Sequence, residues 1–133
     1  MPRPLEIEEK DRQFERFDVQ IELSLFFPQL NSQFTAVTSN ISQSEVIVTT
    51  SKKISCRLFS PVVIEFYNLH GPNSLFLDGY IVRIAPETLL ECLSSALGFG
   101  HLQNRTFYYA IEFDPLDPKL ESQWQKYLAQ LKI

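Results

Sequence analysis

Glycine, cysteine and histidine are scarce in this chain of 133 residues. Four scattered glycines cannot build the glycine-rich loop that cradles phosphate groups. Cys56 and Cys92 have neither a metal-ligand spacing nor enough partners for a disulfide framework, so we expect free thiols. His70 and His101 each adjoin a glycine, and no HxH, HExxH or CxxC pattern occurs. These absences argue against a metal site and against an enzyme.

Long apolar runs and excess basic charge are also missing. No stretch of 18 apolar residues occurs and the N-terminus lacks a secretion signal, so we expect no membrane span and a cytoplasmic location. A net charge of −4 argues against broad binding to DNA or RNA, which requires a basic face. With 44% hydrophobic and 21% charged residues, the composition is that of one ordinary globular domain.

What the sequence does contain is a series of short β patterns. Alternating or β-branched segments predict strands at Val19–Leu25, Phe34–Thr38, Glu45–Thr50, Pro61–Tyr67, Leu75–Ile84 and Arg105–Asp114. Cys56–Phe59 is expected to form a further short strand or edge. The polar segment Ser39–Ser44 is expected to interrupt the second strand, Asn68–Ser74 to form a hairpin loop, and Gly79 to mark a bulge or kink.

Two segments have helical periodicity. Ala85–Leu97 carries leucines at helical spacing and predicts a short helix inserted between strands. Asp117 and Pro118 have the residue types of an N-cap and a first helical position. One apolar face follows them, and it consists of Leu120, Trp124, Tyr127, Leu128 and Leu131.

Antiparallel strands joined by short turns, with a helix closing one end, predict the fold class. It is α+β and mainly β: a small antiparallel barrel of six or seven strands, with a short inserted helix and a C-terminal helix packed on the barrel. Residues 1–11 have few apolar anchors and are expected to form a flexible N-terminal arm. Residues 12–133 are expected to form a single barrel domain.

Two short motifs stand out on this arrangement. Arg12 and Arg16 form an RxxxR pattern just before the first strand, and Asn40-Ile41-Ser42 follows the second strand. Arginine forks suit phosphate oxygens and guanine edges, which they bind in bidentate fashion. In this order, on this series of strands, the two motifs resemble those of the PilZ domain, a bacterial receptor for cyclic di-GMP. The chain departs from the family pattern (D/N)xSxxG at its last position, where Glu45 replaces the glycine.

The resemblance implies a PilZ-like barrel that binds cyclic di-GMP through Arg12, Arg16, Asn40 and Ser42, with Glu45 beside the phosphates. Ligand would draw the N-terminal arm onto the barrel and so change the surface offered to a protein partner. A second hypothesis is a PilZ-fold adaptor that has lost the nucleotide and acts through protein contacts. A third, a small oligonucleotide-binding barrel, is disfavoured by the net charge.

Overall fold

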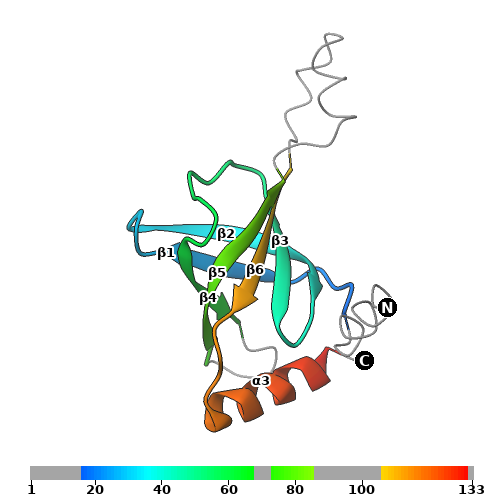
Figure 1. Cartoon of the computed structure of the whole chain (residues 1–133). Coiled ribbons are helices and arrows are strands. Elements are labelled where there is room, and N and C mark those ends of the chain that lie inside the picture. Colours follow the sequence, from blue (N-terminus) through cyan, green and yellow to red (C-terminus); the bar gives the residue numbers. More distant parts are fainter. Residues whose placement is uncertain (1–15, 68–72, 86–105, 132–133) are drawn as a thin grey trace, which may run out of the picture.

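A computed structural model describes residues 16–67, 73–85 and 106–131. Within these ranges the chain forms six antiparallel strands that close into a barrel, with one helix across its end (Figure 1). The elements are β1 (Glu22–Phe27), β2 (Ser32–Ile41), β3 (Glu45–Thr50), β4 (Pro61–Phe66), β5 (Leu75–Ala85), β6 (Phe107–Phe113) and α3 (Pro118–Gln130). The barrel order is β1-β2-β3-β6-β5-β4. This confirms the predicted fold class.

Alternation decides which side chains fill the barrel. Along β1, Leu23, Leu25 and Phe27 are buried, and β4 contributes Val62, Ile64 and Phe66 in the same way. Successive residues of a strand point to opposite faces, so the intervening positions face outwards. β1 begins three residues later than predicted, and the burial of Leu23 and Leu25 agrees with the alternating pattern of the predicted segment.

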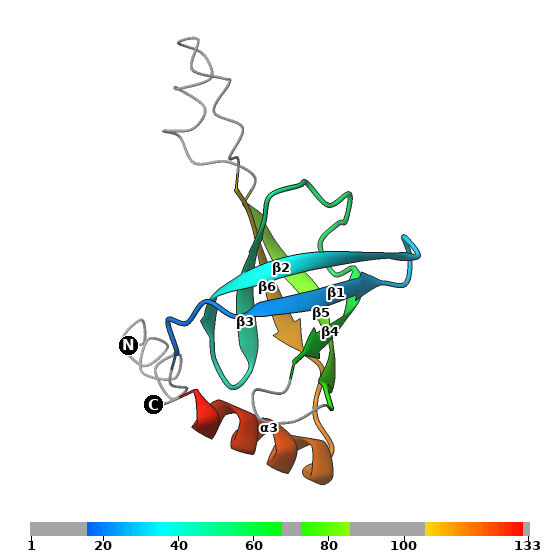
Figure 2. The same cartoon turned by 180° about the vertical axis from the view of Figure 1, so that it is seen from behind.

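The C-terminal helix begins where its cap residues predict. The Asp117 carboxylate Oδ1 accepts a hydrogen bond of 2.8 Å from the Leu120 N–H, and Pro118 is the first helical residue. Trp124 is fully buried, with its ring 4.9 Å from that of Phe66 and 5.2 Å from that of Phe113. An aromatic cluster therefore holds the helix against the barrel. Figure 2 shows the helix lying across one end of the barrel.

Two predictions about local structure are wrong. Cys56–Phe59 forms no strand; it belongs to a loop between β3 and β4 in which Phe59 has a φ of 68°. Gly79 is not a bulge but lies in regular pairing with Phe113. A Cβ at Gly79 would come within 2.5 Å of the Glu112 carbonyl oxygen, so close strand approach explains this glycine.

The polar segment after Thr38 also behaves differently from the prediction. β2 does not stop at Ser39; it continues to Ile41 through a shift of register between Thr38 and Asn40. The predicted inserted helix lies outside the described residues, as do the predicted arm and most of the predicted hairpin loop.

Candidate functional site

A single antiparallel bridge brings the two sequence motifs together. The Phe17 N–H donates to the Ile41 carbonyl oxygen at 2.7 Å, and the Ile41 N–H donates back to Phe17 at 3.0 Å. Phe17 is partly buried and packs against the core, which anchors this segment outside β1. Arg16 is therefore placed beside the segment that carries Asn40 and Ser42. Arg12 lies outside the described residues.

A row of paired residues crosses the outer face of the barrel next to this bridge. Asn40 of β2 pairs with Ile47 of β3, Ile47 pairs with Ala110 of β6, and Ala110 pairs with Arg83 of β5. Directly paired residues point to the same face of a sheet. The row therefore joins a carboxamide at one end to a guanidinium at the other, across two small or aliphatic side chains.

Two bulges produce this row. Thr38 and Ile81 are buried, and a residue two positions further along a regular strand would point inwards as well. The register shifts between Thr38 and Asn40 and between Ile81 and Arg83. An extra residue in each strand reverses the direction of the next side chain, as bulges at functional sites commonly do. A bulge thus turns each polar end of the row, Asn40 in β2 and Arg83 in β5, to the outer face.

The Glu45 carboxylate lies between two guanidinium groups. Its Oε1 is 3.7 Å from Nη2 of Arg16, and its Oε2 is 3.6 Å from Nη2 of Arg83. The arginine side chains are 47% and 68% exposed, and that of Glu45 is 20% exposed. Exposed ion pairs of this kind typically contribute no more than about 1 kcal/mol. The Glu45 carboxylate therefore partly neutralises the two guanidinium groups without fixing their side chains in place.

Ser42 and Asn40 have different surroundings. Ser42 is buried, and both its N–H and its hydroxyl donate to the Glu45 carbonyl oxygen, at 2.8 and 3.2 Å. Its hydroxyl thus closes the β2–β3 turn. The Oδ1 of Asn40 is shielded from solvent and accepts no hydrogen bond from the part of the chain that the structure describes. Such an acceptor favours a donor supplied from elsewhere.

The β2–β3 turn is fixed by two other elements. The Trp124 indole Nε1–H of α3 donates to the Gln43 carbonyl oxygen at 2.9 Å, and the Phe113 N–H of β6 donates to Ser44 at 3.0 Å. Because the last strand and the helix both hold the turn, Glu45 starts β3 from a rigid position. The part of the site that the β2–β3 turn carries is consequently held by β6 and α3.

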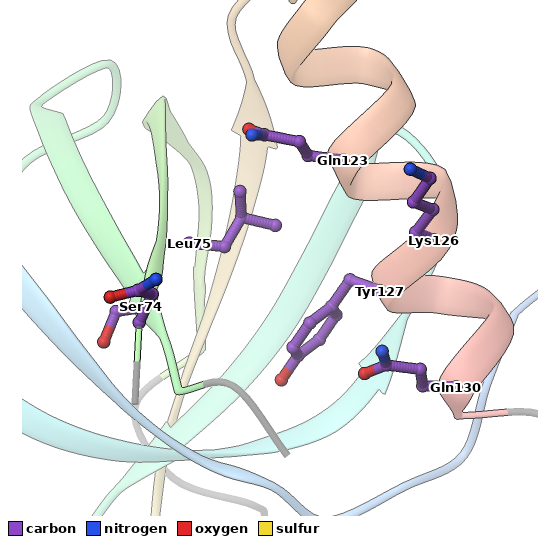
Figure 3. Close-up of a pocket in the computed structure, with 7 residues that line it drawn as sticks. Ser74, Leu75, Gln123, Lys126, Tyr127 and Gln130 are labelled. Atoms are coloured by element: carbon purple, nitrogen blue, oxygen red, sulfur yellow. The ribbon is translucent and has the colours of Figure 1, made fainter. Parts of the chain in front are cut away.

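A separate cleft of about 310 Å³ lies between α3 and the start of β5 (Figure 3). Its lining is mainly polar and includes Ser74, Gln123, Lys126 and Gln130, with the Tyr127 hydroxyl donating to the Tyr67 carbonyl oxygen at 3.3 Å. Of the predicted ligand-binding residues that the structure describes, Arg16, Asn40, Ser42 and Glu45, none lines this cleft. Among the described lining residues, Lys126 is the one cation, and they hold no counterpart of the arginine pair.

The described residues form neither a candidate metal-binding cluster nor a candidate membrane-spanning helix. No group of three or more His, Cys, Asp or Glu side chains in these ranges is arranged to hold a metal ion. No helix among them is long and apolar enough to cross a bilayer.

Motif reasoning missed Arg83. It belongs to neither short motif, and a period-2 reading of β5 places it on the same face as the buried Ile81. Only the register of β5 against β6 shows that it faces outwards beside Glu45. The sequence itself contains no signal that locates this bulge.

Comparison with known proteins gives the architecture a name. No family model and no curated protein matches the sequence. The structure is similar to the cyclic di-GMP-bound PilZ domain of YcgR from Escherichia coli, with a TM-score of 0.66, 14% identity, and 91% of each chain covered. The chain has the PilZ fold.

Two further structures have the same PilZ fold. The PilZ domain of CeSA from a cellulose-synthesising bacterium has a TM-score of 0.62 and 17% identity, over 90% of this chain and 99% of that one. MotI (DgrA), the inhibitor of motility of Bacillus subtilis, has a TM-score of 0.62 and 11% identity, over 90% of this chain and 50% of that one. The barrel thus corresponds to a whole PilZ domain in one case and to half of a longer protein in the other.

Proposed function

We propose that this protein is a cyclic di-GMP receptor that binds the nucleotide on the outer face of the barrel. The observation that carries the proposal is the Phe17–Ile41 bridge, which sets the arginine segment beside Asn40. The PilZ fold supports it, because a PilZ domain of similar structure is described with cyclic di-GMP. The proposal concerns a binding module and not an enzyme.

The chemistry of the site suits a guanine nucleotide with two phosphates. Arg16 and Arg83 offer guanidinium forks for phosphate oxygens, and their planar faces can stack on guanine. The buried Oδ1 of Asn40 can accept a hydrogen bond, which the guanine N1–H or amino group can supply. Ile47 and Ala110 give an apolar floor between these ends.

Arg12 and the N-terminal segment complete the proposal as predictions. Arg12 would supply a further guanidinium four residues before Arg16. Residues 1–11 would be drawn onto the barrel when nucleotide binds, which would change the surface shown to a protein partner. Amide hydrogen exchange would measure this directly, since the proposal expects protection of residues 1–11 to rise only when cyclic di-GMP is added.

Glu45 makes the proposed binding weak. Its carboxylate occupies the position between Arg16 and Arg83 where a phosphate would be placed, so nucleotide and carboxylate compete for the same cations. The same ion pairs favour the alternative function, an adaptor that no longer binds nucleotide. The PilZ fold accommodates either function, and calorimetry decides between them.

The deciding experiment is a calorimetric titration of cyclic di-GMP into the wild type and Arg16→Ala. Loss of a charge-assisted contact is expected to cost about 1.5–3 kcal/mol, which is roughly a 10- to 100-fold weaker Kd. Arg57→Ala, an exposed arginine in the β3–β4 loop, is the matched control and should bind as the wild type does. Equal binding by the wild type and Arg16→Ala would overturn the proposed binding site. No heat at high micromolar nucleotide, even after Glu45→Gly, would favour the adaptor instead.

A further inference from the structure

The outer surface of β1, β4 and β5 is a continuous face whose composition is set by strand register. Phe26 of β1 pairs with Val63 of β4, which pairs with Asp78 of β5. In an adjacent row, Ser24 pairs with Glu65, which pairs with Phe76. In a third row, Pro61 pairs with Tyr80. With Glu22, these outward positions are here named the β1–β4–β5 face.

Two large aromatic side chains on this face are exposed to solvent. Phe76 is 55% exposed and Phe26 is 38% exposed, with the half-buried Val63 and Glu65 between them. The barrel core does not need these rings, because the neighbouring inward positions, Leu25, Ile64 and Leu77, are fully buried. Exposed apolar patches bordered by polar residues are typical of interaction sites.

The charge on the face has a single sign. Glu22, Glu65 and Asp78 occupy outward positions, and Glu112 of β6 lies next to Tyr80. No Lys or Arg occupies any outward position of the β1–β4–β5 face as defined above. Glu65 pairs with Phe76, and Asp78 lies two residues further along β5 on the same face, so carboxylates and an exposed ring are neighbours there.

We propose that the β1–β4–β5 face binds a protein partner whose surface presents Lys or Arg among aliphatic side chains. Such a partner pairs its cations with Glu65 and Asp78, stacks them on Phe26 and Phe76, and buries its aliphatic groups on Val63. The same charge disfavours other occupants. An anionic membrane or a nucleic acid is repelled, and so is a second copy, which would set carboxylates against carboxylates.

This inference does not depend on nucleotide binding. The face and the arginine site share only β5 among their strands: Phe76, Asp78 and Tyr80 belong to the face, and Arg83, further along the strand, belongs to the site. The two also adjoin where Tyr80 pairs with Glu112 and Glu112 pairs with Glu45. A partner can therefore be tested with or without cyclic di-GMP.

The probe is a short synthetic peptide of alternating Lys and Leu, titrated into isotopically labelled protein and followed by amide chemical shifts. A peptide of alternating Glu and Leu provides the charge control. The test variant combines Phe76→Ser with Asp78→Lys. The control variant combines Leu58→Ser, which is 52% exposed in the β3–β4 loop, with Glu121→Lys on α3. All four positions are exposed, so native spectra are expected from both variants.

The proposal expects shifts confined to β1, β4 and β5 with the Lys-Leu peptide. Binding should weaken at least tenfold in Phe76→Ser/Asp78→Lys and be unchanged in the control variant. Shifts elsewhere, no shifts, or equal binding of the Glu-Leu peptide would overturn it. So would self-association that Phe76→Ser abolishes, or binding of the wild type to phosphatidylserine vesicles. These results stand whether or not cyclic di-GMP gives heat, so failure here is distinct from failure of the nucleotide proposal.

Discussion

The guanidinium of Arg16 lies 3.7 Å from the carboxylate of Glu45, at the position where the PilZ motif has glycine. The same carboxylate reaches Arg83 on its other side. The residue that departs from the motif is therefore an ion-pair partner of Arg16, a cation that the motif would offer to phosphate, and of Arg83, which lies outside both motifs. In the proposed function, the weak binding of cyclic di-GMP is therefore due to one side chain, that of Glu45.

Replacing Glu45 by Gln should tighten cyclic di-GMP binding about tenfold. Two unit charges about 6 Å apart at an effective dielectric of about 20 repel by roughly 2–3 kcal/mol, and half of that corresponds to a factor of ten. Glutamine keeps the size of the side chain, so only its charge is tested. Calorimetry measures the change, with Glu121→Gln on α3 as control; an unchanged or weaker Kd for Glu45→Gln contradicts the competition.

Arg83 should act on the nucleotide directly as well as through Glu45. We expect Arg83→Ala to weaken binding roughly tenfold in the wild type, as loss of one charged contact would. In a Glu45→Gln background the same substitution should still weaken binding. If the effect disappears there, Arg83 only holds the carboxylate aside.

Replacing Gly79 by Ala should destabilise the barrel by about 1–3 kcal/mol, because the new methyl group meets the backbone of Glu112 where β5 and β6 approach. Urea unfolding measures the loss. Asp78→Ala, at an exposed position on the same strand, should change the free energy of unfolding by less than about 0.5 kcal/mol. Equal stability of Gly79→Ala and the wild type would mean that the strands separate there at little cost.

Stability should fall in alkaline solution. Burial raises the pKa of Tyr127 above its ordinary value of 10.0, and burial also raises that of Tyr109. The folded state holds these protons more tightly than the unfolded state. The contribution of the two protonated tyrosines to the free energy of unfolding is therefore complete below pH 10, and it is lost as pH rises through the folded pKa values. Melting temperatures from pH 8 to 11 test this, and Tyr127→Phe should reduce the alkaline slope.

The sequence predicts the barrel well because its strands and final helix follow simple periodicities. Alternation in Glu45–Thr50 gives the bounds of β3 without error, and the cap at Asp117 locates the start of α3. These features depend on neighbours along the chain. Local propensity and burial pattern point to the same structure, so each is predictable.

The site is less predictable because it depends on strand register. Asn40 and Arg83 face outwards only because an extra residue precedes each. The polar segment from Ser39 suggested an interruption of β2 but not the direction of Asn40, and no residue type marks the bulge before Arg83. The one glycine that suggested a bulge serves strand packing instead. Ser42 was expected on the ligand and lies in the turn, with its hydroxyl bonded to the Glu45 carbonyl oxygen. The ligand-binding roles of Arg12, Arg16, Asn40 and Ser42 stay predictions.

The most direct test of the proposed function is an amide chemical-shift titration of the protein with cyclic di-GMP. The account predicts shifts at Arg16, Phe17, Asn40, Ile41 and Arg83, where the bridge and the two bulges form the site. Residues of the cleft beside α3 should not respond. Spectra that stay unchanged at millimolar nucleotide, or shifts confined to that cleft, would contradict the account.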